Sequence, residues 1–83
     1  MYHIQLGSVP ERFSFDSVAD ARAFAVNAIS KKKCLYAYLY NSDRSNIEDA
    51  SIVREDGKYL CYQYNKNRES TIYTVRKDGE LVR

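Results

Sequence analysis

The sequence has no tryptophan, one histidine, one proline, two cysteines and three glycines among its 83 residues. His3, the only histidine, has no nucleophile near it in the sequence, so we expect a polar surface residue rather than a general acid or base. Cys34 and Cys61 lie in strand-like runs without CxxC spacing, which is typical of buried, reduced thiols. A glycine-rich phosphate loop, a nucleophile elbow and a metal-ligand spacing are all absent. We therefore expect a protein that is not an enzyme and that binds no metal or cofactor.

Long apolar runs are also absent, and the first residues, MYHIQLGSVP, contain no hydrophobic segment of the secretory type. Together with the unpaired cysteines, this predicts a cytoplasmic protein that does not associate with membranes. The net charge is only +2, from 13 basic and 11 acidic residues, which neither demands nor excludes an anionic partner. With 45% hydrophobic and 29% charged residues, the composition is that of a globular protein. We expect one domain spanning residues 1–83.

The clearest structural signal is the segment 51–64, in which two strand-like runs flank Asp56-Gly57. Asp-Gly between such runs predicts a two-residue hairpin turn, because glycine accepts positive φ and the primed turn matches the twist of the strands. A two-residue loop also sets the register of the two strands. The expected pairs are Glu55 with Lys58, Arg54 with Tyr59, Val53 with Leu60, Ile52 with Cys61 and Ser51 with Tyr62.

Residues 17–33 form the only helix that the sequence predicts. Ser17 is the expected N-cap, and apolar residues recur at three- and four-residue spacings, which indicates one apolar stripe. The stripe consists of Val18, Ala21, Phe24, Ala25, Ala28 and Ile29. Strands are expected at 2–6 and 34–40, on both sides of Asp56-Gly57, at 70–77 and at 80–83, with a polar loop at 41–46. Phe13 and Phe15 indicate either a short strand or an anchored approach to the helix.

Asp78-Gly79 repeats the turn signal of Asp56-Gly57, and we expect the same turn chemistry in both places. The predicted fold class is α+β: one helix packed on a curved antiparallel sheet of four to six strands, in the order β-α-β-β-β-β with a short C-terminal strand. The expected core is Ile4, Leu6, Phe15, Val18, Ala21, Phe24, Ala25, Ala28, Ile29, Leu35, Ala37, Leu39, Ile52, Cys61, Tyr73 and Val75.

Eight tyrosines against three phenylalanines are the unusual feature of the composition. Strand alternation places many of them, with Val53 and Ile72, on the sheet face that one helix cannot cover. Tyrosine combines a large apolar ring with a polar tip, which suits interfaces. We therefore expect a small non-enzymatic binding or regulatory module that docks a protein partner, or a second copy of itself, through this face. The expected contact residues are Tyr36, Tyr38, Tyr40, Leu60, Tyr62 and Tyr64, with Arg54 and Lys58 near the rim.

Size and the absence of catalytic residues suggest an adaptor or inhibitor, of the kind found among accessory proteins of phages and mobile elements. Two other interpretations of the tyrosine-rich face remain open. The N-terminal segment could cover it, or it could be an ordinary amphipathic surface, because more than half of a normal protein surface is apolar.

The alternative function is nucleic-acid binding, because cations interleaved with aromatic residues on a sheet can hold phosphates and stack bases. Basic residues cluster at turns around the tyrosine-rich strands: Arg44, Arg54, Lys58, Lys66, Arg68, Arg76 and Lys77. The pattern RxDGxYxxYxY over 54–64, followed by Ile72-Tyr73, resembles the three-stranded, arm-type DNA-binding domains of some integrases. The resemblance covers less than half of the chain. Those domains place their helix after the strands, whereas this sequence predicts it before them.

Overall fold

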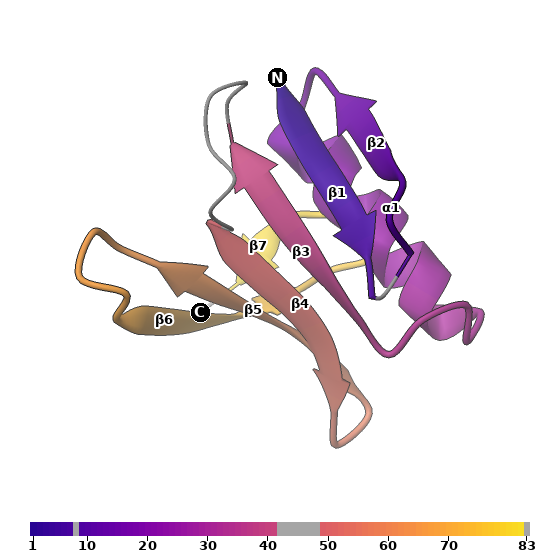
Figure 1. The fold of residues 1–83 in the computed structure, drawn as a ribbon. Coiled ribbons are helices and arrows are strands. Elements are labelled where there is room, and N and C mark those ends of the chain that lie inside the picture. The colour runs from indigo at the N-terminus through magenta and orange to yellow at the C-terminus, as the bar shows by residue number, and fades with distance from the viewer. Residues whose placement is uncertain (8, 42–48, 83) are drawn as a thin grey trace.

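The computed structural model of the chain describes residues 1–7, 9–41 and 49–82, and contains one helix and one antiparallel sheet (Figure 1). Along the chain, the elements are β1 (Tyr2–Leu6), β2 (Arg12–Phe15), α1 (Val18–Ser30), β3 (Tyr36–Asn41), β4 (Ala50–Glu55), β5 (Lys58–Tyr64), β6 (Ser70–Val75) and β7 (Leu81–Val82). Neighbouring strands pair in the order β2-β1-β3-β4-β5-β6-β7, so the sheet is open, with β2 and β7 at its edges. The α+β class with a single helix agrees with the prediction for the described residues.

The sheet has seven strands, so the expected number of four to six was wrong. The strand missing from the predicted order is β2, which precedes α1 and pairs with β1. In this pairing Phe13 lies opposite Ile4, and Phe15 lies opposite Tyr2. A strand of four residues gains its stability from its cross-strand neighbours, so the alternation of Phe13 and Phe15 alone left its structure undecided.

The local signals at the hairpin and at the start of the helix are confirmed. β4 and β5 pair in the predicted register, including Glu55 opposite Lys58. Asp56 and Gly57 have φ values of 52° and 77°, as a type I′ turn requires. Ser17 is the N-cap of α1, because its Oγ accepts a hydrogen bond of 3.3 Å from the backbone N–H of Asp20.

The helix ends at Ser30, three residues before the predicted end at residue 33, because the lysines that follow form a C-terminal turn. The backbone N–H of Lys33 donates to the Ala28 carbonyl and that of Lys32 to the Ile29 carbonyl, both at 3.0 Å. Lys32 has a φ of 60°. This hydrogen-bond pattern is a Schellman C-cap, with lysine at the left-handed position that glycine usually occupies.

This turn delays the next strand. β3 begins at Tyr36 instead of residue 34, and Leu35 is 83% exposed in the connection before it. The prediction that Leu35 belongs to the core was therefore wrong. The polar loop predicted at 41–46 lies outside the described residues, apart from Asn41, which ends β3.

α1 packs across β1, β2, β3 and β4 and forms one hydrophobic core with the sheet face that it covers. Small residues at the contact let the helix axis lie close to the sheet. The buried residues are Ile4, Leu6, Ala37, Leu39, Ala50, Ile52, Cys61 and Val75 from the sheet, and Ala21, Ala25, Val26, Ala28 and Ile29 from the helix. The Phe24 ring packs against Phe13 and Phe15, with centroids 4.9 and 5.2 Å apart, and closes one border of the core. Tyr73, which was expected in the core, is half-buried.

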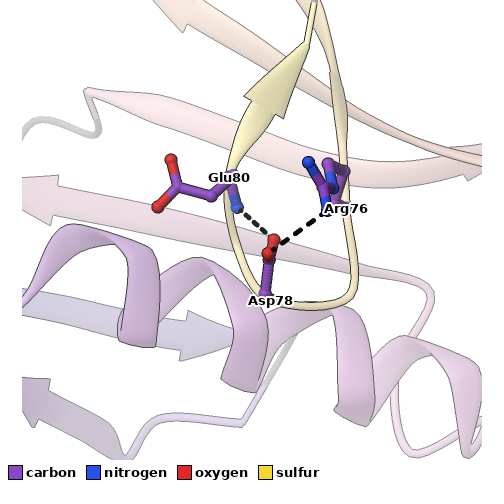
Figure 2. A network of polar contacts seen from close by, with 3 residues as sticks. All are labelled: Arg76, Asp78 and Glu80. Atoms are coloured by element: carbon purple, nitrogen blue, oxygen red, sulfur yellow. Dashed lines mark hydrogen bonds and ion pairs between the residues drawn. The ribbon is translucent and has the colours of Figure 1, made fainter.

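The second Asp-Gly turn has a different conformation from the first. Gly79 has a φ of 89°, but Asp78 does not share the positive φ of its counterpart in the first turn. The backbone N–H of Arg76 donates to the Glu80 carbonyl at 2.9 Å, which closes a three-residue loop. Figure 2 shows the Asp78 carboxylate accepting a 3.0 Å hydrogen bond from the Glu80 N–H and pairing with Arg76 at 3.7 Å. The expectation of identical turn chemistry was therefore wrong.

The turn between β6 and β7 also docks on the N-terminal half of α1, beside which it lies in Figure 2. The Arg22 guanidinium donates from Nη1 to the Gly79 carbonyl at 2.7 Å. A Cβ placed on Gly79 would overlap the Ala19 carbonyl and lie 3.0 Å from the Ala23 nitrogen. The turn between β6 and β7 therefore contacts α1, the same helix that packs across β1, β2, β3 and β4.

Candidate protein-binding surface

The sheet face opposite α1 carries two rows of residues that the strand registers place side by side. One row runs through Tyr38, Ser51, Tyr62 and Ile72, and the other through Tyr36, Val53, Leu60 and Thr74. Tyr64 lies beyond Tyr62 on β5 and faces the same way, because side chains alternate along a strand. We call the apolar and aromatic members of these rows the tyrosine face: Tyr36, Tyr38, Val53, Leu60, Tyr62, Tyr64 and Ile72.

No described element packs over the tyrosine face. Figure 1 views β1, β3 and β4 with α1 behind them, so the helix covers the other side of the sheet. Ile72 is 52% exposed, and the remaining members are half-buried by their neighbours on the sheet. The rings of Tyr36 and Tyr38 meet edge to face, with centroids 5.3 Å apart. The surface is thus a continuous apolar area rather than scattered exposed side chains.

Polar contacts hold two of the tyrosines in place. The Tyr64 hydroxyl lies 2.9 Å from the Ser51 hydroxyl, and the guanidinium of Arg68 lies 4.6 Å from the Tyr64 ring centroid. The Tyr62 hydroxyl donates to the Glu55 carboxylate at 3.2 Å. Partial desolvation on the sheet and this hydrogen bond to Glu55 raise the pKa of Tyr62 above its ordinary value. Side chains fixed in this way lose little conformational entropy when a partner binds.

Two of the predicted contact residues are not accessible on the tyrosine face: Tyr40 lies on the same side of β3 but is covered, and Arg54 faces the helix. Tyr40 is only 7% exposed, because the Arg12 guanidinium lies 4.0 Å from its ring centroid. Its hydroxyl donates to Gln5 at 3.4 Å. Arg54 lies opposite Tyr59 on the helix side of the sheet, with its guanidinium 5.7 Å from that ring centroid. Tyr40 is therefore not an accessible contact residue, and Arg54 is not at the rim of this face.

Lys58 is exposed at the end of β5 and lies opposite Glu55, on the same side as the tyrosine face. Of the predicted rim residues, only Lys58 thus occupies the expected position. The remaining predicted contact residues, Tyr36, Tyr38, Leu60, Tyr62 and Tyr64, lie together as the alternation of the strands required.

The cations of the nucleic-acid alternative do not form one patch. Lys66 and Arg68 lie in the turn that follows β5, whereas Lys58 begins that strand, and seven residues separate the two ends by about 20 Å. Arg76 lies near the Lys58 end and pairs with Asp78. Arg54 faces the helix side, and Arg44 lies outside the described residues.

The structure also shows a polar pair that sequence reasoning missed. His3 Nδ1 lies 2.9 Å from the Ser14 hydroxyl at the surface, because β1 and β2 pair these residues directly. The spacing in sequence contained no sign of this contact, since β2 itself was undecided. A cross-strand polar pair of this kind is an ordinary stabilising contact of a sheet.

The cysteines lie apart from the tyrosine face. Cys61 is fully buried in the core, and burial raises the pKa of its thiol, an effect that the nearby positive charge of Arg22 partly opposes. Cys34 is half-buried, and desolvation raises the pKa of its thiol, while a hydrogen bond with the Tyr36 backbone lowers it.

Within residues 1–7, 9–41 and 49–82, no group of three or more His, Cys, Asp or Glu side chains could hold a metal ion. In the same residues, no helix is long and apolar enough to cross a bilayer.

Comparison with known proteins gave no match: no family model fits the chain, and neither a curated protein nor a solved structure is similar to it.

Proposed function

We propose that this protein is a non-enzymatic binding module of the adaptor or inhibitor type, which docks a protein partner or a second copy of itself through the tyrosine face. The observation that supports the proposal is the double row of aromatic and aliphatic side chains on a sheet face over which no described element packs. The contact residues are Tyr36, Tyr38, Leu60, Tyr62 and Tyr64, with Lys58 at the rim.

The proposal includes a curved sheet, in agreement with the contact between Gly79 and Ala19. A sheet whose far turn returns to the helix bends toward it, so the tyrosine face is on the convex side. Such a face suits a partner with a flat or concave apolar surface. The proposal also places the protein in the cytoplasm, in agreement with the free thiols of Cys34 and Cys61.

Truncation of the tyrosines tests the proposal. Tyr38→Ala and Tyr62→Ala each remove a half-exposed ring, so we expect both variants to unfold cooperatively near the wild-type temperature while association weakens by about tenfold or more. Thr71→Ala is the matched control, because it truncates an exposed side chain on β6 that faces away from the tyrosine face. The unfolding transition is measured by circular dichroism before any binding experiment. If both tyrosine variants fail to fold, this face is core and the proposal is wrong.

Association is measured by quantitative pull-down from cells that express the wild type, the tyrosine variants or the control, with and without nuclease. Light scattering of the purified protein measures self-association in parallel. The proposal expects either protein partners or a dimer that the tyrosine variants lose and Thr71→Ala keeps. Partners that all four proteins capture equally would contradict it.

The alternative is nucleic-acid binding through the cations around the same strands. The observation that favours it is the guanidinium of Arg68, which lies over the Tyr64 ring with Lys66 in the same turn. This alternative expects binding that weakens steeply with salt and is lost in Lys66→Ala, because phosphate contacts release counterions. Binding that does not respond to salt or nuclease excludes it.

A further inference from the structure

An exposed leucine marks a second surface, on the helix side of the molecule. Leu35 is 83% exposed between the end of α1 and the start of β3. On one side of it lies a depression of about 370 Å³, lined by Ile29, Lys32, Cys34, Leu35 and Arg54, which we call the basic groove. A second depression of about 220 Å³ shares Cys34 and Leu35 with it and adds Leu6, Gly7, Val9, Lys33 and, at its border with the tyrosine face, Tyr36. The two depressions form one surface on both sides of the leucine.

The charged residues that line this surface, among those the structure describes, are all basic. Lys32 and Arg54 line the basic groove, Lys33 lines the adjoining depression, and no acidic side chain of residues 1–7, 9–41 and 49–82 lines either of them. Glu55, the neighbour of Arg54 on β4, faces the opposite side of the sheet, where it accepts the Tyr62 hydroxyl. Like charges around a small depression repel one another, so a bound anion lowers the electrostatic energy of the site.

The backbone at Lys32 adds an independent observation. Lys32 adopts a φ of 60° at the C-terminal turn of α1, where any residue with a side chain is less favourable than glycine. Its side chain lines the basic groove. Lysine thus occupies a position where glycine would make the fold more stable. This pattern is expected where the side chain is needed for function rather than for stability.

We infer that this surface binds a peptide segment of a partner protein in which acidic residues flank an apolar side chain. The apolar side chain packs against Leu35 and Ile29, and the carboxylates meet Lys32 and Arg54. The inference does not rest on the tyrosine face, because these residues lie on the helix side of the sheet or before β3 begins. A peptide with both features accounts for the whole surface. Its acidic residues account for the three cations, and its apolar side chain accounts for the exposed Leu35.

The test is a titration of the isotope-labelled protein with a synthetic peptide in which glutamates flank a central pair of leucines, followed by amide resonances in NMR spectra. We expect saturable shifts at residues 29–35 and at Arg54, and weaker binding as salt rises from about 50 to about 300 mM. A peptide with lysine in place of glutamate, and one with serine in place of leucine, should both bind more weakly.

Variants of the protein separate function from structure. Arg54→Gln and Lys32→Gly should each weaken peptide binding by about fivefold, the effect of one partly exposed ion pair. Lys32→Gly should at the same time raise the melting temperature, because glycine relieves the positive φ. Lys66→Gln is the matched control for charge, because Lys66 is an exposed cation at the far end of the sheet. Tyr62→Ala should leave peptide binding unchanged.

Four outcomes would overturn the inference. The first is an absence of saturable shifts up to about 1 mM peptide, and the second is binding of the lysine-containing peptide as tight as that of the glutamate-containing one. The third is a set of shifts confined to the tyrosine face. The fourth is a concentration-dependent dimer that Leu35→Ser abolishes. The last outcome would make a second copy of the chain the occupant. Binding of inorganic phosphate or of anionic lipid vesicles with the peptide inactive would likewise exclude a peptide ligand.

Discussion

Replacing Gly79 by alanine should destabilise the protein far more than replacing Gly57, although both glycines follow an aspartate in a turn between strands. Both have a positive φ, of 89° and 77°, so alanine is strained at either position by about 1–2 kcal/mol. At Gly57 no atom lies within 4 Å of the added Cβ. At Gly79 the Cβ would overlap the Ala19 carbonyl and lie 2.7 Å from its carbon. These are backbone atoms of α1, which cannot rotate aside.

The overlap at Gly79 adds about 1–3 kcal/mol for a forced backbone shift, so Gly79→Ala should cost about 2–5 kcal/mol in total. A domain of this size is stable by roughly 4–12 kcal/mol, and each kcal/mol corresponds to a change of about 4–8 °C in its Tm. We therefore expect Tm to fall by about 8–40 °C for Gly79→Ala and by about 4–16 °C for Gly57→Ala, with the larger fall at Gly79. The turn must also move away from Arg22, which then loses its hydrogen bond to the Gly79 carbonyl.

Urea unfolding followed by circular dichroism measures both variants under one set of conditions. Equal losses of unfolding free energy, within about 0.5 kcal/mol, would refute the packing of the turn between β6 and β7 against α1. A larger loss for Gly57→Ala would refute it as well. The matched pair isolates the tertiary contact, because the residue change and the sign of φ are the same in both variants.

Two further predictions concern titratable groups. With a thiol reagent at neutral pH, Cys34 should react while the protein is folded. Cys61 is fully buried and the pKa of its thiol is raised, so it should react only as fast as the protein unfolds. Equal reaction rates of the two thiols in the folded protein would contradict the buried position of Cys61. Because folding raises the pKa of Tyr62, its contribution to stability is complete below the pKa of the unfolded side chain and is lost as pH rises through the folded pKa. Glu55→Gln should lower the pKa of Tyr62, measured by NMR titration of the tyrosine ring carbons, and an unchanged value would contradict the contact between these two residues.

Features that depend on neighbours in the chain could be predicted from the sequence. The register of β4 and β5 follows from Asp56-Gly57, because a two-residue loop leaves the strands one way to pair. Ser17 could be identified as the N-cap because the N–H that its hydroxyl accepts from belongs to Asp20, only three residues further along the chain. The grouping of the tyrosine face follows from these same registers and from strand alternation, so its members Tyr62 and Leu60 were placed correctly on one side.

Features that depend on distant segments could not be predicted. β2 is a strand because β1 supplies its partner, and Tyr40 is covered because that pairing brings Arg12 over its ring. The exposure of Leu35 depends on where the helix cap lets β3 begin.

The two Asp-Gly turns show most clearly which features depend on local sequence and which depend on tertiary contacts. The sequence by itself determined that residues 56–57 and 78–79 are turns with glycine at positive φ, because that preference belongs to the dipeptide and its flanking strands. Only the tertiary structure decided that the first turn extends into solvent while the second lies against α1, with Gly79 in contact with Ala19. Contact between segments that are far apart in the chain depends on how the whole sheet packs, and no short stretch of sequence contains that information.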